Sequence, residues 1–391
     1  MKVAFVVHRY GQEVRGGAEA ISREFAVRLA KRGVEIEVFT SCAVDYRSWR
    51  NEYEPGTSTD EGVTVHRFAT EAERSEDFDD FTGALYAQGP SVTREMQLEW
   101  MDKQGPYAPS LVTALQDEAH RFDLVIFVTY LYWTTWNGLQ AAPSKAVLNP
   151  TAHDEPPIRL PLFDEMFRIP KAFIFYSEPE RSYVHRRFEL GEIPEAVTGI
   201  GIDGPSAPPG PRPASVPEKY LVCFGRVDQS KGVDRLIEHY ITYRARRGDA
   251  IDLVLMGDPV MDVPPTPGIT LLGIVDDETK WSVLANATIL VHPSPYESFA
   301  HALLEGFMVE RPAIVNGNCA VTVDHSCRSG AGLWYRSYAE FEAALDMLLA
   351  DGDLRDAMGA QGRRYVETTF AWDRVVDRYE RFLHSVSSRL T

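Results

Sequence analysis

Short apolar segments alternate with amphipathic segments along most of the chain. The segment Leu124–Val128 is continuously apolar, which is typical of a strand in a parallel sheet that helices cover on both faces. Between the first two such segments, apolar residues recur on one helical stripe, namely Ala18, Ile21, Phe25 and Leu29. This predicted helix is expected to end near Gly33. The strands predicted in the first half are Lys2–Val7, Glu35–Thr40, Thr64–Ala69, Leu124–Thr129, Lys145–Asn149 and Ala172–Ser177.

A segment rich in proline and glycine, residues 204–217, interrupts this alternation. Such a composition does not build a core element, and it predicts a linker between domains. The strands predicted after it are Tyr220–Phe224, Ile251–Met256, Ile269–Leu272, Thr288–His292 and Pro312–Asn316. Two α/β halves joined by a hinge predict a ligand-binding cleft. We therefore predict α/β domains at residues 1–203 and 204–371, followed by an amphipathic helix at 372–391 that packs on either domain.

Composition and charge narrow the possible partners. The chain has 391 residues, which suits two domains, and a formal net charge of −17. A chain this acidic is not expected to bind nucleic acid through its overall field, because phosphates are attracted by clustered Lys and Arg. No segment approaches the ~20 apolar residues that cross a bilayer. The first apolar segment, Val3–Val7, is short and is followed at once by His8 and Arg9. We therefore expect a cytoplasmic protein with no signal peptide.

The first motif with chemical meaning is Gly16-Gly17-Ala18-Glu19, between the first strand and the first helix. Adjacent glycines let a backbone come close to a ligand, and the helix N-terminus attracts anions. The spacing is not that of the dinucleotide-binding GxGxxG motif. A tight strand-to-helix turn accounts for the same two glycines equally well.

A second motif, Phe224-Gly225-Arg226-Val227-Asp228-Gln229-Ser230-Lys231-Gly232, follows the first strand of the second half. Arg226 and Lys231 are expected at the carboxyl end of that strand. A guanidinium matches phosphate oxygens with a planar fork, and an ammonium adds a compact charge. Together they predict a pyrophosphate site, although exposed basic residues in a loop are the ordinary alternative.

A third motif places Glu297 and Glu305 eight residues apart, after the strand Thr288–His292 and around a helix predicted to start near Phe299. Their carboxylates can accept hydrogen bonds from sugar and ribose hydroxyls. The helix dipole alone would explain Glu297, but not Glu305, which lies beyond the first helical turn.

His153 follows the strand that ends at Asn149. It therefore lies at the carboxyl end of a parallel strand, where open α/β sheets bind their ligands. A histidine there can act on protons near neutral pH, although a lone histidine is often structural.

A long insertion, residues 70–116, does not fit the simple alternation and is predicted to be partly helical. Insertions at the carboxyl end of a strand often shape a substrate site, and a surface elaboration is the equal alternative. The candidate acceptor contacts are Tyr10, Trp100 and Tyr107.

This set of motifs resembles the retaining GT-B glycosyltransferases of family four, the glycosyl transferases of group 1. The resemblance extends over nearly the whole chain and is greatest from Tyr220 to Pro312. Its specific part is the Glu-x7-Glu segment with Arg and Lys upstream. It implies two Rossmann-like domains whose parallel sheets face a cleft, the first on the acceptor side and the second binding the nucleotide sugar. It also implies that the helix after Trp372 crosses back to the first domain.

The resemblance implies roles in leaving-group chemistry for five residues. Arg226 and Lys231 would hold the diphosphate and neutralise its charge, and Gly16 and Gly17 would let the first domain approach the phosphates. His153 would lie over the donor sugar near the reacting carbon. With Glu297, the residues Arg226, Lys231 and His153 form the predicted catalytic set.

The resemblance also implies contacts to the rest of the donor. Glu305 would bind the ribose, and Glu297 the hydroxyls of the donor sugar. Ile274 and Val275 would border the nucleobase. The backbone donors beside Glu297 are Ser298, Phe299 and Ala300.

The chain departs from the family pattern at two places. It has Asn316-Gly-Asn-Cys-Ala320 where many relatives carry a glycine pair followed by Pro-Glu, and His301 where an aliphatic residue is common. These departures put the local donor contacts in question and could alter the sugar preference.

The resemblance predicts a retaining transfer of sugar from a UDP- or GDP-linked donor to a hydroxyl of a small molecule, a saccharide or a lipid-linked acceptor. No carboxylate stands out as a nucleophile, so same-face attack, with the departing phosphate taking the acceptor's proton, is expected. No cofactor and no metal are expected, because the two Asp-x-Asp sequences, Asp77–Asp79 and Asp351–Asp353, read as solvated loops. The membrane contact expected is at most peripheral. A nucleotide-sugar epimerase or hydrolase and a non-catalytic nucleotide-binding relative remain the alternatives.

Overall fold

A computed structural model describes residues 1–14, 16–248 and 251–390. The chain forms two compact units. Unit 1 comprises Met1–Gly199 together with Val376–Thr391, and unit 2 comprises Ile200–Val375. The sequence-based boundaries, 203/204 and 371/372, lie close to these divisions. The linker residues 204–214 form neither helix nor strand.

Unit 1 is built on an eight-stranded sheet in the order β3-β4-β2-β1-β5-β6-β7-β8. Every neighbouring pair is parallel except β3 and β4, which form an antiparallel edge. Continuous apolar runs such as Leu124–Val128 are buried, as expected for strands covered on both faces. The strands are β1 (Lys2–Val6), β2 (Glu35–Ser41), β3 (Gly56–Asp60), β4 (Val63–Phe68), β5 (Leu124–Val128), β6 (Ala146–Asn149), β7 (Ala172–Phe175) and β8 (Glu195–Val197).

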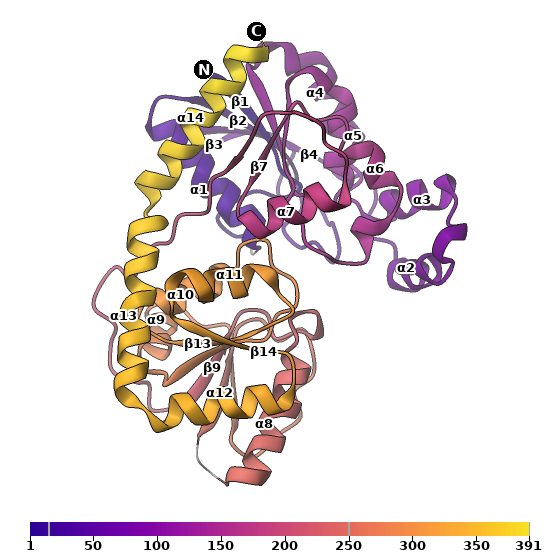
Figure 1. Cartoon of the computed structure of the whole chain (residues 1–391). Coiled ribbons are helices and arrows are strands. Elements are labelled where there is room, and N and C mark those ends of the chain that lie inside the picture. The colour runs from indigo at the N-terminus through magenta and orange to yellow at the C-terminus, as the bar shows by residue number, and fades with distance from the viewer. Residues whose placement is uncertain (15, 249–250, 391) are drawn as a thin grey trace. The chain divides into compact units, whose positions relative to one another are not determined.

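The helices of unit 1 include the last helix of the chain. Its Tyr379 ring stacks on Phe25 with centroids 4.3 Å apart, and Arg378 donates to the carbonyl of Thr198 at 2.7 Å. The first and last helices thus lie side by side (Figure 1). The helices are α1 (Gly17–Lys31), α2 (Phe78–Ala87), α3 (Arg94–Gln104), α4 (Pro109–Glu118), α5 (Trp133–Ala141), α6 (Leu162–Met166), α7 (Glu178–Arg187) and α14 (Trp372–Leu390). The insertion expected at 70–116 is therefore largely helical, through α2, α3 and most of α4.

Unit 2 is built on a six-stranded, all-parallel sheet in the order β11-β10-β9-β12-β13-β14. In Figure 1 its helices lie on both sides of the sheet, with α10 and α11 opposite α8 and α12. The strands are β9 (Tyr220–Phe224), β10 (Asp252–Met256), β11 (Ile269–Gly273), β12 (Ile289–His292), β13 (Ala313–Asn316) and β14 (Gly332–Tyr335). The helices are α8 (Val233–Arg247), α9 (Asp277–Asn286), α10 (His301–Met308), α11 (Ala320–Ser329), α12 (Tyr338–Ala350) and α13 (Gly352–Thr369).

No helix within the described residues combines the length and the hydrophobicity needed to span a membrane.

Candidate functional site

In unit 2 a lysine and a glutamate from two different loops meet at the carboxyl edge of the sheet. Lys231 lies in the loop from β9 to α8, and Glu297 in the loop from β12 to α10. Because β9 and β12 are neighbouring parallel strands, their carboxyl ends reach the same edge. The Nζ atom of Lys231 is 2.7 Å from Oε1 of Glu297, and Nε2 of His292 is 3.4 Å from the same oxygen. The structure therefore brings two predicted site residues into contact, 66 positions apart in sequence.

This contact keeps the Glu297 carboxyl ionised. Burial alone raises the pKa of Glu297, but the charge of Lys231 and the contacts from His292 and Lys231 outweigh burial and hold the pKa well below its usual range. The side chain of Glu297 is only 15% exposed, so the ion pair is shielded from water. An incoming phosphate would compete with Glu297 for the ammonium of Lys231.

Arg226 lies in the same β9–α8 loop as Lys231. Its side chain is 39% exposed, and Nη1 is 3.9 Å from Oδ2 of Asp228.

A second ionic group in unit 2 joins Glu305 to Lys280. Oε1 of Glu305 is 3.1 Å from Nζ of Lys280, which also lies 3.0 Å from Asp277. Burial lowers the pKa of Lys280, but Glu305 and Asp277 raise it above its ordinary value overall. Beside them, burial and the charge of Lys280 lower the pKa of His301, partly offset by Glu305. The ring of His301 is therefore neutral near pH 7.

Lys280 is not among the residues predicted from the sequence, because its partner Glu305 lies 25 residues away along the chain. The only signal was a lysine one turn into the helix that follows Ile274 and Val275. These two residues lie between β11 and α9, with Ile274 51% exposed and Val275 half-buried. Ile274 thus presents an apolar surface between β11 and α9.

The loop before α10 differs from the prediction. The helix begins at His301 rather than near Phe299, because Ala300 adopts a left-handed conformation with φ +63°. Phe299 and Ala300 are buried, whereas Ser298 is half-buried. The amides of this segment therefore belong to a turn and not to the first turn of the helix.

The Asn316–Ala320 departure has a structural role. Nδ2 of Asn316 donates to the carbonyl of Pro293 at 2.8 Å, and its Oδ1 accepts from the amide of Asn318 at 2.9 Å. The asparagine thus ties the end of β13 to the loop that carries Glu297.

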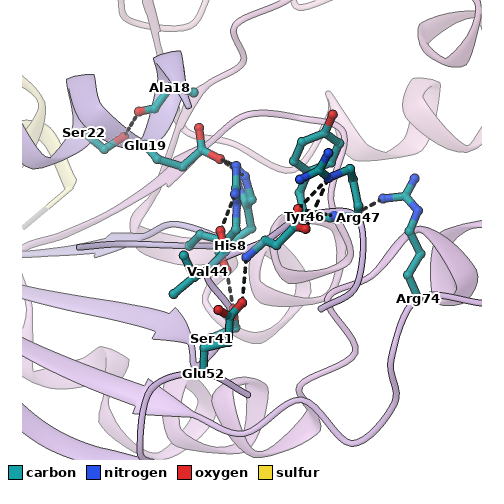
Figure 2. A network of polar contacts seen from close by, with 12 residues as sticks. His8, Ala18, Glu19, Ser22, Ser41, Val44, Tyr46, Arg47, Glu52 and Arg74 are labelled. Atoms are coloured by element: carbon teal, nitrogen blue, oxygen red, sulfur yellow. Dashed lines mark hydrogen bonds and ion pairs between the residues drawn. The ribbon is translucent and has the colours of Figure 1, made fainter. Parts of the chain in front are cut away.

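In unit 1 the Glu19 carboxylate lies beside Gly16 and contacts His8, a contact that Figure 2 shows. A Cβ on Gly16 would overlap the Glu19 carboxylate, whereas a Cβ on Gly17 would meet nothing within 4 Å. The Glu19 carboxylate accepts from Nε2 of His8 at 2.8 Å and from the guanidinium of Arg9. Glycine at position 16 is therefore explained by Glu19, while position 17 alone leaves open space beside the helix N-terminus.

The Glu19 network is buried and charged. Burial raises the pKa of Glu19, but His8 and Arg9 outweigh burial and lower the pKa to about 2. The His8 ring stacks on Tyr132 with centroids 3.7 Å apart. The network fixes the end of β1 to the start of α1, and nothing in the glycine motif of the sequence indicated this pairing.

His153 lies in the loop after β6, where Thr151 has φ +52°. Its Nδ1 is 3.5 Å from Oε1 of Glu155, and its side chain is 24% exposed. Glu180 stabilises this loop, because its Oε1 accepts a hydrogen bond from the amide of Ala152 at 2.8 Å. The imidazole therefore has solvent access on a fixed loop.

Two of the three predicted acceptor contacts are wrong. Tyr10 is 0% exposed and Trp100 is 1% exposed, and the indole of Trp100 donates to Oγ1 of Thr82 at 3.0 Å. Both rings fill the interior of unit 1 and present no surface to a substrate. Tyr107 is half-buried and stays a prediction.

The Asp-x-Asp sequences have local partners. Asp77 pairs with Lys103 at 2.9 Å, and Asp351 caps α13 by accepting from the amide of Leu354 at 2.9 Å. In the part of the chain that the structure describes, no cluster of three or more His, Cys, Asp or Glu residues is arranged to hold a metal ion.

Residues 211–365 match the family model of glycosyl transferases group 1. This match lies entirely within unit 2. A curated relative from Methanocaldococcus jannaschii, described as the uncharacterized glycosyltransferase MJ1607, is 23% identical over 167 residues, which cover 40% of this chain and 43% of the relative. The chain therefore matches less than half the length of that relative.

Solved structures resemble the whole chain. Sucrose-phosphate synthase of Thermosynechococcus elongatus aligns with a TM-score of 0.73 at 16% identity, covering 99% of both chains. Alr3699/HepE of Anabaena, solved in complex with UDP, aligns with a TM-score of 0.67 at 15% identity, covering 98% of this chain and 100% of that chain. The chain has the GT-B fold, with two parallel-sheet α/β units.

Proposed function

We propose that the chain is a retaining glycosyltransferase that moves a sugar from a nucleoside diphosphate sugar to a hydroxyl acceptor. The observation that carries the proposal is the contact of Lys231 with Glu297 at the carboxyl edge of the sheet in unit 2, within the residues that match the group 1 family model. This contact joins a cation suited to a diphosphate with a carboxylate suited to sugar hydroxyls.

Leaving-group stabilisation is the main task of the proposed site. Cleavage of the anomeric bond builds negative charge on the diphosphate and positive charge on the sugar ring. Lys231 and Arg226 offer fixed positive charge where the negative charge develops, and such preorganised electrostatics usually provides the largest catalytic effect. In the proposed complex, phosphate oxygens replace Glu297 as the partner of Lys231, and Glu297 turns to the sugar.

The nucleoside would lie at the second ionic group. Glu305 can accept hydrogen bonds from ribose hydroxyls, and Ile274 with Val275 can cover the base. A uridine or guanosine donor is proposed, with support for UDP from the Anabaena structure solved with that nucleotide.

The proposed course needs no metal and no enzyme nucleophile. The acceptor hydroxyl attacks from the face that the diphosphate leaves, and a departing phosphate oxygen takes its proton. His153, solvent-accessible on a fixed loop, is the proposed contact of unit 1 to the donor sugar.

A thermal-shift panel of UDP-, GDP-, ADP- and dTDP-sugars tests donor binding. We expect one nucleotide to raise Tm clearly, because ligand binding to the folded state adds stability. Arg226→Ala should reduce that shift, whereas Arg235→Ala, an exposed arginine on α8, should leave it unchanged. No shift with any nucleotide sugar would contradict the proposal.

Product analysis then separates transfer from the alternatives. With the best donor, release of nucleotide that depends on an added hydroxyl acceptor supports a transferase. Release or isomerisation of the sugar without any acceptor would identify a hydrolase or an epimerase. Binding without turnover across a broad acceptor screen would identify a non-catalytic relative.

A further inference from the structure

A chain of hydrogen bonds connects α13, α11 and the loop before α10 in unit 2. The hydroxyl of Tyr365 is 3.0 Å from Nδ1 of His325, and Nε2 of His325 is 2.9 Å from the carbonyl oxygen of Phe299. His325 and Phe299 are each 2% exposed. A buried imidazole thus bridges a helix hydroxyl and the backbone of the loop that carries Glu297.

The direction of each hydrogen bond follows from the chemistry of the groups. A carbonyl oxygen can only accept, so Nε2 must carry the hydrogen. A neutral imidazole has a single N–H, so Nδ1 accepts and the Tyr365 hydroxyl donates. Only one of the two neutral tautomers satisfies both contacts.

The surroundings favour this neutral form. Burial lowers the pKa of His325 to about 4; the hydrogen bond to Phe299 opposes the shift, and the nearby Arg328 and His292 add to it. The rings of Phe299 and Phe370 meet the imidazole edge-on, with centroids 5.4 Å and 5.6 Å away. These apolar contacts hold the ring in place and exclude water.

The carbonyl that His325 holds belongs to the peptide that joins Phe299 to Ala300. In a planar trans peptide the C=O and the N–H point in opposite directions. Fixing the Phe299 carbonyl toward His325 therefore directs the Ala300 amide away from His325. Ala300 has φ +63°, a conformation that is unfavourable for a non-glycine residue and persists where neighbours enforce it.

We propose that His325, oriented by Tyr365, is a positioning residue that fixes the Phe299–Ala300 peptide in the orientation needed to bind the donor. The inference rests on the proposed function, and His325 acts through the loop without touching the donor. Loss of its hydrogen bond leaves the buried carbonyl without this partner and lets the peptide rotate, which weakens binding.

The tautomer is the first test, because it does not depend on activity. ¹⁵N NMR of the histidine-labelled chain should show His325 as the neutral Nε2–H tautomer at pH 7. In Tyr365→Phe the Nε2–H tautomer should remain, because the Phe299 carbonyl still needs a donor, whereas the Nδ1 resonance should shift because Nδ1 loses its hydrogen bond. An Nδ1–H tautomer or a charged ring in the wild type would overturn the proposal.

Nucleotide affinity is the second test, with UDP or GDP as the probe, whichever the wild type binds more tightly by calorimetry. We expect about tenfold weaker binding in His325→Ala, consistent with the loss of one buried hydrogen bond. His325→Gln should restore most of the affinity, because its Nε2 can donate to the Phe299 carbonyl. His239→Gln, on α8, is the matched control and should bind as the wild type does.

Two results distinguish failure of the inference from failure of the proposed function. Wild-type affinity in His325→Ala overturns the inference alone. A wild type that binds neither nucleotide overturns the proposed function, and the inference falls with it. If His325→Ala does not fold, Tyr365→Phe is compared with Tyr243→Phe, which removes a hydroxyl contact to Asp346 at 2.8 Å. If Tyr365→Phe binds the nucleotide more weakly than the wild type and Tyr243→Phe does not, the proposal is supported. Equal binding in the two variants overturns it.

Discussion

Glu180 is a buried acid whose protonation should control how the stability of unit 1 depends on pH. Its side chain is 1% exposed, and its carboxyl oxygens accept from the amides of Ala152 at 2.8 Å and Tyr176 at 2.7 Å. Burial raises the pKa of Glu180 from 4.5 to about 8, although these backbone hydrogen bonds act to lower it. The folded chain therefore keeps this proton at a pH where the unfolded chain has released it.

The sign of the effect follows from proton linkage. Below pH 4.5 both states hold the proton, and Glu180 adds no pH dependence to the free energy of unfolding. From pH 4.5 to about 8 only the unfolded chain releases it, so the free energy of unfolding falls by about 1.4 kcal/mol per pH unit. The loss over this range is roughly 5 kcal/mol and is complete above about pH 8.

Glu180→Gln isolates this effect, because glutamine has nearly the same shape and does not titrate. Glutamine keeps one acceptor oxygen, so the variant also loses one hydrogen bond, a cost of about 1–3 kcal/mol that does not vary with pH. Urea unfolding followed by tryptophan fluorescence from pH 5 to pH 9 gives the free energy for both proteins. The wild type should lose stability relative to the variant as the pH rises.

Glu189→Gln is the matched control, since Glu189 is an exposed glutamate just beyond the same helix. The free energy of unfolding of Glu189→Gln should change with pH in the same way as that of the wild type. If the free energy of unfolding of Glu180→Gln also changes with pH as that of the wild type does, Glu180 is ionised in the folded chain throughout this range. The reasoning from burial would then be refuted.

Three further predictions concern the site and its supporting turns. Lys231→Ala should lower turnover by about 10²-fold or more in a nucleotide-release assay, because it removes charge that stabilises the leaving group. Lys219→Ala changes an exposed lysine and should not lower turnover. Equal rates in the two variants would exclude leaving-group stabilisation by Lys231. Glu305→Ala should mainly weaken nucleotide affinity, and unchanged binding by calorimetry would count against a ribose contact. Gly16→Ala should lower the stability measured by thermal unfolding by about 1–3 kcal/mol, because its Cβ overlaps Glu19. Gly17→Ala, whose Cβ meets nothing within 4 Å, should fold normally. Equal Tm values for the two variants would argue that Glu19 moves aside at little cost.

The strands that sequence patterns predict well are those buried on both faces. Apolar runs such as Leu124–Val128 have no other stable place in an α/β unit, so pattern and structure agree. The pattern fails at sheet edges. β3 has the polar sequence Gly-Thr-Ser-Thr-Asp, and β4 is its one neighbour in the sheet. β14 has four residues, and its Trp334 is 43% exposed.

The residues of the candidate site also differ in how well the sequence predicts them. Lys231 and Glu297 were predictable because each follows a strand at the carboxyl edge of the sheet, and Glu305 because of its spacing from Glu297. Their partners were not, because a contact between distant positions leaves no periodic signal. Lys280 and His325 reach the site from helices whose sequence shows only ordinary amphipathic spacing. Tyr10 and Trp100 fail for another reason, since aromatic residues near a site are often core residues, which their burial shows.

One sequence signal for the site was present but unused, namely a glycine at the end of three neighbouring strands. Gly225 and Gly257 follow β9 and β10 directly, and Gly273 is the last residue of β11. The amide of Gly257 donates to the carbonyl of Gly273 at 2.8 Å, and a Cβ on Gly257 would overlap the carbonyl of Gly225. Backbone therefore packs on backbone along this edge, and no side chain of these three residues occupies the space above it. Bulk is removed beside the loop that presents Arg226 and Lys231, which leaves room there for the diphosphate of the proposed donor.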